Sequence, residues 1–162
     1  DIGVAGAYPG LVDDPLIASV RVGEDPLECA LLATSHPLAS RTWLTPADLA
    51  DVPFLFIPRA THPRLYDTVM SVFDQIGLTP RIEGSFSGPR TIWRLAADSM
   101  GWSLGNRFHR TSPPAGLVAI PIEGLRIPAG IQLLWRRDEG DHGIKTVLDA
   151  FRRSKGAVNA DL

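Results

Sequence analysis

The hydrophobic residues of the chain fall into short runs, and these alternate with segments in which apolar positions recur every three or four residues. Short apolar runs bounded by Gly, Pro or acidic residues predict strands, whereas the wider spacing predicts amphipathic helices. The expected strands are Asp1–Ala5, Leu16–Val22, Leu27–Ala33, Pro53–Ile57, Arg81–Ser85, Gly116–Pro121 and Gly130–Trp135. Their alternation with helices predicts an α/β fold with a mostly parallel sheet covered by helices.

Four helices are expected between these strands. A short one begins at Thr45, because Thr45 can cap it, Pro46 fits the first turn and Asp48 completes a capping-box pattern. The others are expected from Pro63 to Gly77, from about Ser87 to Gly101, and from about Gly143 to Arg153. The glycines at two of these ends favour left-handed helix termination.

The order of the elements predicts two lobes with a ligand site between them. Residues 31–121 form one lobe, residues 1–30 and 122–154 form the other, and residues 155–162 form a flexible tail. The strand Leu27–Ala33 and the segment before Gly130 would cross between the lobes as a hinge. The chain opens on Asp1 without an initiator Met, and the flanking lobe has few elements. We therefore expect that this lobe is incomplete and that the chain is truncated at its N-terminus.

The composition limits the partners. The chain has 162 residues, and its 16 Lys and Arg against 18 Asp and Glu give a formal net charge of -2. No strong positive field is expected, so nucleic acid is not an expected direct partner. The apolar runs are shorter than the roughly 20 residues of a membrane span. Cys29 is the single cysteine, which excludes an internal disulfide and favours a buried thiol and a cytoplasmic location.

No set of residues predicts catalysis. The four histidines, His36, His62, His109 and His142, are too scattered to predict a metal site, and no cofactor fingerprint occurs. The run Gly101-Trp-Ser-Leu-Gly105 matches a nucleophile elbow by letter. It follows a helix instead of ending a strand, however, so it favours a short buried strand whose glycines allow close packing. The expectation is a binding module and not an enzyme.

Two loops suit ligand binding. The loop after Ile57 lies at the carboxyl end of a strand and beside a helix N-terminus, where open α/β sheets hold ligands and where backbone N–H groups attract anions. Within it, Arg59 could pair with an acidic ligand or remain a solvated surface residue. Ser87, in the second loop, could cap the next helix or contact the ligand.

The order of several motifs resembles the effector-binding domain of LysR-type transcriptional regulators. The motifs are Asp1-Ile-Gly-Val4, Glu24-Asp-Pro-Leu-Glu-Cys-Ala-Leu-Leu-Ala33, His36-Pro-Leu-Ala39, Leu44-Thr-Pro-Ala-Asp-Leu49, Phe73-Asp-Gln-Ile-Gly-Leu-Thr-Pro80 and Phe151-Arg-Arg153. The loop Ile57-Pro-Arg-Ala-Thr-His-Pro-Arg-Leu65 is most similar to the branch that regulates the catabolism of aromatic compounds.

The resemblance implies a two-lobed domain of the type 2 periplasmic-binding-protein kind, with a small aromatic or carboxylate effector between its lobes. It also implies a homo-oligomer, and DNA binding only through an N-terminal winged helix-turn-helix that this chain lacks. Together with the loop, it predicts effector contacts at Pro58, Arg59, Ala60, Thr61, Pro63 and Leu65, and Trp102 would add bulk near the cleft. Gly6 and Leu65 depart from the pattern of the aromatic-acid branch.

Two other classes of protein remain open at this point. An extracytoplasmic solute-binding protein would carry a secretory leader upstream of Asp1. An enzyme with the same two-lobed fold would need a perturbed acid, base or nucleophile in the cleft.

Overall fold

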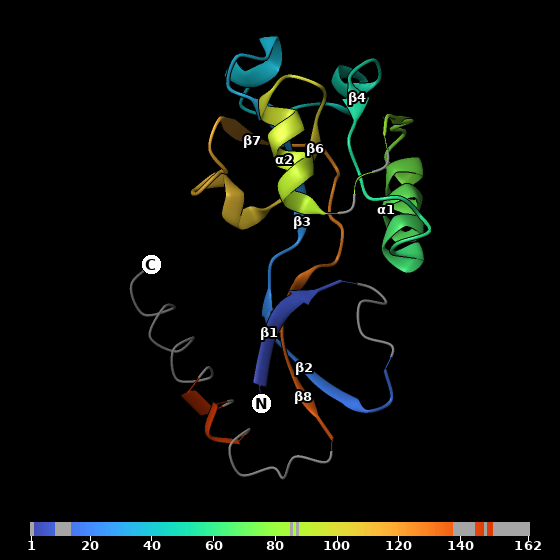
Figure 1. Ribbon diagram of the computed structural model, residues 1–162. Coiled ribbons are helices and arrows are strands. Elements are labelled where there is room, and N and C mark those ends of the chain that lie inside the picture. Colours follow the sequence, from blue (N-terminus) through green and yellow to red (C-terminus); the bar gives the residue numbers. More distant parts are fainter. Residues whose placement is uncertain are drawn as a thin grey trace.

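The computed structural model describes residues 2–8, 14–84, 86, 88–137, 145–147 and 149–150, and these residues form two lobes (Figure 1). The first lobe contains β1 (Ile2–Ala7), β2 (Ile17–Glu24) and β8 (Gly130–Arg136). The second contains β3 (Leu27–Ala33), β4 (Pro53–Phe54), α1 (Pro63–Gln75), β5 (Arg81–Ile82), α2 (Pro89–Ala97), β6 (Ser103–Asn106), β7 (Leu117–Pro121) and the 3₁₀ turns η1 (Pro37–Ser40), η2 (Pro46–Leu49) and η3 (Arg107–Arg110).

The first lobe is built on a three-stranded sheet in the order β1-β8-β2. Both pairs are antiparallel, and the register between β2 and β8 shifts between Arg21 and Gly23. Gly130, at the start of β8, allows the closest approach: a Cβ there would collide with the Gly23 carbonyl oxygen.

The second lobe is built on the sheet β6-β3-β7, whose two pairs are also antiparallel. Its central strand β3 is almost continuously apolar because both of its faces are covered. Ala30 and Leu32 belong to the larger apolar cluster with α1, while Leu31 belongs to the smaller cluster with α2. This alternation places one helix on each face of the sheet. Cys29 is fully buried in β3, as expected.

An aromatic core joins α1 to the edge of this sheet. The ring of Phe54 lies 4.5 Å from that of Trp102 and 5.3 Å from that of Phe73, measured between centroids. All three side chains are fully buried. Aromatic contacts of this kind contribute about 0.5–1.5 kcal/mol per pair beyond area burial.

Two short segments cross between the lobes and lie side by side (Figure 1). Asp25 N donates to Ala129 O at 3.0 Å, and Leu27 and Ile127 exchange backbone hydrogen bonds of 3.0 and 2.9 Å. The paired crossings leave few backbone bonds between the lobes, an arrangement typical of hinges.

Most predicted elements of the described chain are confirmed. Strand β3 has the predicted bounds, and Gly101-x-Ser-x-Gly105 leads into strand β6 instead of an elbow. Helix α1 begins at Pro63 as predicted, and α2 begins at Pro89, close to its expected start near Ser87. The capping box of η2 is present, since Thr45 N donates to the Asp48 carboxylate at 2.8 Å and Asp48 N donates to Thr45 Oγ1 at 3.4 Å, but it opens a 3₁₀ turn. Positions 145–147 and 149–150 are helical. The rest of the expected fourth helix, Ser85, Ser87 and the tail 155–162 lie outside the described residues.

Two predictions about topology are wrong. The sheet is not mostly parallel: within the described residues the parallel contacts are β4 with β5 and two isolated bridges, because each three-stranded sheet is built from antiparallel neighbours. Leu27–Ala33 is not a crossing but the central strand of the second lobe. The chain crosses just before it, at Asp25–Pro26, where the strand pattern breaks at a proline.

Within the described residues, no helix has the length and apolar character that a membrane span requires.

Candidate functional site

A cavity opens where β4 and β6 separate. Trp102 N donates to Pro53 O and Leu55 N donates to Trp102 O, both at 2.8 Å, which joins the two strands in parallel. Beyond Leu55 no backbone hydrogen bond links these two described segments. Ligands of α/β proteins usually bind at the carboxyl ends of neighbouring parallel strands. A cavity of about 210 Å³ fills this gap.

Residues from both lobes line the cavity. The wall consists of Tyr8, Leu27, Leu55, Phe56, Ile57, His62, Leu65, Gly88, Pro89, Ile92, Trp93, Ser103, Leu104, Asn106 and His109. Most of them are apolar, and none is Lys, Arg, Asp or Glu. Among the described lining residues, Tyr8 alone comes from beyond the crossings, just after β1, and the others come from Leu27 onward in the second lobe.

The hydroxyl of Ser103 is the most unusual group in this wall. The side chain is 2% exposed, and Ser103 Oγ has no hydrogen-bond partner within the described residues. Burial of a hydroxyl without a partner costs about 1–3 kcal/mol. The hydroxyl is buried beside the cavity, and a polar group maintained at that cost is suited to bind a ligand that reaches it.

Asn106 and His109 form the polar end of the cavity. The Asn106 backbone N–H donates to His109 Nδ1 at 3.2 Å, and the Asn106 side-chain NH₂ donates to the Asp25 carboxylate. Burial lowers the pKa of His109, so the ring is neutral near pH 7. Because Nδ1 accepts a hydrogen bond, the ring proton lies on Nε2. The ring packs edge-on against Trp93, with centroids 5.3 Å apart.

Tyr8 brings a phenol to the cavity from the first lobe. Burial raises the pKa of Tyr8, and the nearby Asp25 carboxylate raises it further. The phenol therefore stays protonated at physiological pH. Its hydroxyl can both donate and accept a hydrogen bond.

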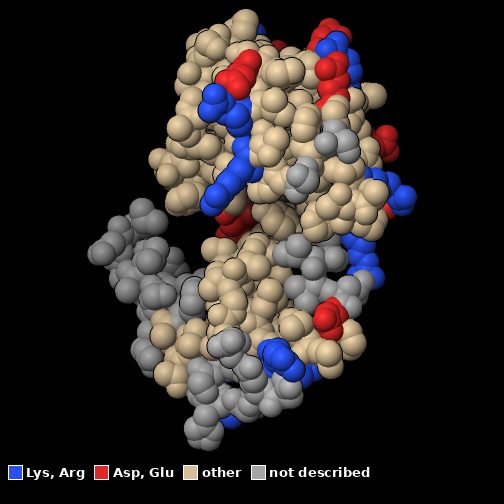
Figure 2. All heavy atoms as spheres, in the orientation of Figure 1, with Lys and Arg blue, Asp and Glu red and all other residues tan. Residues whose placement is uncertain are grey.

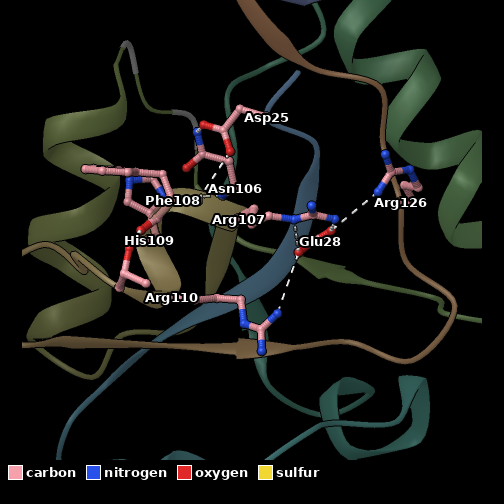
Figure 3. A network of polar contacts seen from close by, with 9 residues as sticks. Asp25, Glu28, Asn106, Arg107, Phe108, His109, Arg110 and Arg126 are labelled. Carbon is pink, nitrogen blue, oxygen red and sulfur yellow. Dashed lines mark hydrogen bonds and ion pairs between the residues drawn. The ribbon is translucent and has the colours of Figure 1, made fainter. Parts of the chain in front are cut away.

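A charged network lies beside the cavity, at the crossings (Figure 3). Glu28, which is 14% exposed, accepts two hydrogen bonds from Arg107 and lies 3.9 Å from Arg110 and 3.7 Å from Arg126. Arg126 belongs to the returning segment and Arg107 to η3, so one carboxylate connects β3, η3 and the second crossing. Asp25 adds a further link, accepting from Phe108 N at 3.2 Å.

The structure places the predicted site residues in three positions. Leu65 lies in the cavity wall. The remaining loop residues, Pro58, Arg59, Ala60, Thr61 and Pro63, do not line the cavity; Pro58 is half-buried and the other four are exposed. Trp102 is fully buried in the aromatic core, next to the cavity but outside its lining.

Arg59 is engaged on the surface. Its Nε and Nη2 atoms donate to the two carboxylate oxygens of Asp67 at 2.6 and 2.8 Å. The Asp67 partner raises the pKa of Arg59, and Arg59 in turn lowers the pKa of Asp67. The Arg59 side chain is 65% exposed, which agrees with a solvated surface residue that also pairs with Asp67. Its role as a partner of an acidic ligand stays a prediction.

Sequence reasoning missed most of the cavity wall. Ser103 and Asn106 carried a usable signal, since both are polar residues in a short strand that the flanking pattern marked as buried. Tyr8, Trp93 and His109 carried none, because their positions depend on how distant segments meet. Within the described residues, no three His, Cys, Asp or Glu side chains group as a metal site.

The face shown in Figure 2 carries its charges in small groups of both signs. Uncharged surface separates these groups. This face therefore offers no continuous basic surface for a polyanion.

The chain matches known proteins over most of its length. The family model described as LysR substrate binding domain matches residues 1–155. The chain is 30% identical over 91 residues to the HTH-type transcriptional regulator TtuA of Agrobacterium vitis, covering 56% of this chain and 30% of that protein. It is 34% identical over 93 residues to the HTH-type transcriptional regulator CatR of Pseudomonas putida, covering 57% and 32%. The chain thus spans under a third of the length of each curated relative in these matches.

Solved structures share the fold at low identity. The effector binding domain of BenM with its effector benzoate superposes with a TM-score of 0.71 at 21% identity, covering 98% of this chain and 71% of that one. The effector binding domain of QuiR in complex with shikimate gives 0.65 at 18% identity, covering 91% and 68%. Full-length CbnR complexed with its target DNA gives 0.71 at 20% identity, covering 94% and 52%. The fold is that of the two-lobed, type 2 periplasmic-binding-protein-like effector domains, and the chain belongs to the LysR substrate-binding domain family.

Proposed function

We propose that this chain is the effector-sensing part of a LysR-type transcriptional regulator and that it binds a small, largely apolar metabolite in the cavity between β4 and β6. The observation that carries the proposal is the cavity of about 210 Å³ with the buried, unpartnered hydroxyl of Ser103 in its wall. The volume is below the roughly 300–1,000 Å³ of pockets for drug-sized ligands. It suits a molecule of about one ring.

Sensing follows from the position of the cavity. Tyr8 of the first lobe meets second-lobe residues there, so a ligand that contacts both favours one arrangement of the lobes. A ligand shifts such an equilibrium by the difference between its affinities for the two arrangements. The paired crossings connect the site to the hinge, because Asn106 in the cavity wall donates a hydrogen bond to Asp25 of the first crossing. A change at the cavity can therefore alter the arrangement of the lobes.

The output of the whole protein is part of the same proposal. The curated relatives are described as HTH-type regulators, and this chain covers about a third of them. We propose that a winged helix-turn-helix outside this chain contacts DNA, that the protein acts as a homo-oligomer and that it works in the cytoplasm. We expect the part of the chain from β3 to Ile127 to act as one lobe and β1, β2 and β8 to act as the other, with the crossings at their junction. The boundary between residues 30 and 31 that the sequence favoured is not kept, because it would divide β3, the central strand of the second lobe.

Within the site, Leu65 would contact the effector directly. The loop Pro58–Pro63 would form the rim at the start of α1, and Trp102 would hold β4 against β6 from behind. These roles for Pro58, Arg59, Ala60, Thr61, Pro63 and Trp102 remain predictions.

Enzymatic activity has less support than binding. A serine nucleophile needs a base within hydrogen-bond reach. The hydroxyl of Ser103 accepts from and donates to no described residue. The closest match to a nucleophile motif therefore lacks its base.

A ligand screen with a blocked cavity tests the proposal. The chain is heated alone and with benzoate, shikimate, catechol or benzyl alcohol, and the same compounds are tested on Leu65→Trp, which fills the wall, and on Met100→Trp, which adds the same ring at an exposed position. At about 100 times its Kd, a ligand stabilises the folded state by about 2.7 kcal/mol. We expect at least one compound to raise Tm in wild type and Met100→Trp, but not in Leu65→Trp. A shift that survives in Leu65→Trp would place the site elsewhere, and no shift with any compound would refute a single-ring ligand.

A further inference from the structure

The cavity wall carries no formal charge near pH 7 at its polar end, although it lies beside a charged network. None of its lining residues is Lys, Arg, Asp or Glu. Burial lowers the pKa of His109 and keeps its ring neutral near pH 7. A carboxylate bound against this end of the wall would meet no lysine or arginine among the described lining residues. Burying an ionised group without a partner is strongly unfavourable.

The charged side chain nearest to the wall through hydrogen bonds is an acid. Asp25 accepts from the side chain of Asn106, which lies in the wall. Its negative charge also acts on Tyr8 and His109. It raises the pKa of Tyr8, which burial also raises, and it raises the pKa of His109, which burial lowers. Those two residues face the cavity from different lobes. The polar end of the cavity therefore lies in a negative field.

The neighbouring arginines do not cancel this field at the cavity. Arg107 is close enough to Asp25 for the two charges to interact, but its guanidinium donates hydrogen bonds of 3.1 and 3.3 Å to Glu28. Arg110 and Arg126 also approach Glu28. In Figure 3 the guanidiniums of Arg107, Arg110 and Arg126 gather around Glu28.

Two helix starts adjoin the described cavity, that of α1 through His62 and Leu65 and that of α2 through Gly88 and Pro89. Helix N-termini attract anions through free backbone N–H groups and the helix dipole. Both helices begin with a proline at the first position, and proline has no N–H. Each end is therefore a weaker anion site than an ordinary helix start.

The hydroxyl of Ser103 supplies the remaining polar contact. It is buried and has no partner among the described residues, and it can both donate and accept. A ligand hydroxyl matches it in either role, whereas a carboxylate offers only acceptors.

We propose that the cavity selects an uncharged ligand of about one ring that carries a hydroxyl group, and that it discriminates against a carboxylate of the same size. Ser103 determines the preference for the hydroxyl, and Asp25 determines the rejection of the anion. The inference rests on the proposed function, because it assumes that the cavity is the effector site.

A matched pair of probes tests the inference on the intact chain. Benzyl alcohol and benzoate have the same ring and nearly the same size but differ in charge at pH 7. We expect calorimetric titration to give benzyl alcohol an affinity at least about tenfold higher than that of benzoate. Equal affinities, or tighter binding of benzoate, would overturn the inference and would indicate that a helix start dominates.

Two variants separate the contributions. Ser103→Ala should weaken benzyl alcohol about fivefold and leave benzoate unchanged, because only the alcohol uses the hydroxyl. Asp25→Asn should reduce the preference for the alcohol by about threefold or more, since it removes the negative charge but keeps a hydrogen-bond acceptor for Asn106. Asp98→Asn, at the far end of α2 and paired with Arg94 on the surface, is the control and should change neither affinity.

The outcomes separate this inference from the proposed function. If benzoate binds better and Leu65→Trp abolishes its binding, the cavity is a ligand site and only the charge preference is wrong. If neither probe binds, the inference fails, and the proposed function fails with it when shikimate and catechol also leave Tm unchanged. If Leu65→Trp leaves both affinities intact, the site lies elsewhere and both proposals fail. If Asp25→Asn does not fold, the wild-type preference and the response of Ser103→Ala still decide the matter.

Discussion

Removal of the Ser103 hydroxyl should have opposite effects on stability and on binding. The change to test is Ser103→Ala in the unliganded chain. The hydroxyl is 2% exposed and has no partner among the described residues, so the folded chain has lost its hydration and gained no hydrogen bond in return. The unfolded chain exposes the same group to water. Replacing serine with alanine at such a site therefore removes a cost that only the folded state bears.

The magnitude follows from two terms. Relief of an unpaired buried hydroxyl is worth about 1–3 kcal/mol. The missing oxygen enlarges a cavity that already exists, so the lost contacts cost a few tenths of a kcal/mol. The net gain is about 1 kcal/mol in the free energy of unfolding. For a chain of 162 residues, this corresponds to a rise of about 2–4 °C in Tm.

Urea unfolding at pH 7 without ligand measures this gain through the midpoint at constant slope. Ser112→Ala, at an exposed bend after η3, is the control and should change stability by less than about 0.5 kcal/mol. A loss of stability in Ser103→Ala would refute the reasoning, because it would mean that the hydroxyl makes a favourable bond in the unliganded chain. An unchanged midpoint would show that the hydroxyl bears no desolvation cost.

Three further predictions concern the scaffold around the site. Gly101→Ala should destabilise the chain by at least about 2 kcal/mol in urea unfolding, because φ is 152° at this residue and a Cβ would collide with the Pro53 carbonyl oxygen. An unaffected midpoint would contradict the close approach of β4 to β6. Asp48→Asn should reduce the acid sensitivity of the chain. Hydrogen bonds from Thr45 lower the pKa of Asp48, so the stabilising effect of this carboxylate is present at neutral pH and is lost as the pH falls below the ordinary aspartate range. Unfolding midpoints of wild type and variant, measured from pH 3 to 7, should therefore converge at the acid end. Burial raises the pKa of the Cys29 thiol to about 11, so iodoacetamide at pH 8 should label the chain only at the rate of unfolding; rapid labelling of the folded chain would contradict its burial.

The sequence predicted the elements of the second lobe more reliably than their arrangement. Strand β3 could be recognised because both faces are covered and its apolar run is continuous. The starts of α1 and α2 could be recognised because Pro63 and Pro89 fix the first helical turn. These are local properties, and each is written in a few adjacent residues.

Strand direction was not predictable in the same way. The alternation of strands and helices is compatible with a parallel sheet, but here β3 pairs with β6 and β7, which run opposite to it. Periodicity identifies which side chains are buried and leaves the choice of neighbour to long-range contacts. The expected strand Pro53–Ile57 illustrates the limit: only Pro53–Phe54 is regular, and the next three residues leave the sheet to line the cavity.

The candidate site was predicted only at its edge. The loop after Ile57 was chosen because it lies between a strand and a helix, and it does lie there, yet only His62 within it and Leu65 after it reach the cavity wall. The reason is geometric. The cavity forms between chain segments that lie far apart in the sequence, so its polar end is contributed largely by β6 and η3.

The buried polar atoms that lack a hydrogen bond, and that therefore destabilise the fold, are concentrated in one short segment. The buried side-chain atoms that lack a hydrogen-bond partner in the described part of the chain are Trp102 Nε1, Ser103 Oγ and Asn106 Oδ1. All three lie on β6 or next to it, in a lobe whose other buried side chains are apolar. Native proteins satisfy most buried polar atoms, so a cluster of exceptions in one short strand is not what stability alone would produce. The same strand lines the cavity together with Tyr8, and it ends at Asn106, whose side chain donates to Asp25. Strand β6 therefore combines destabilising polar groups, a cavity wall and a hydrogen bond to the crossings. This combination is the strongest physical reason to propose that β6 binds the ligand.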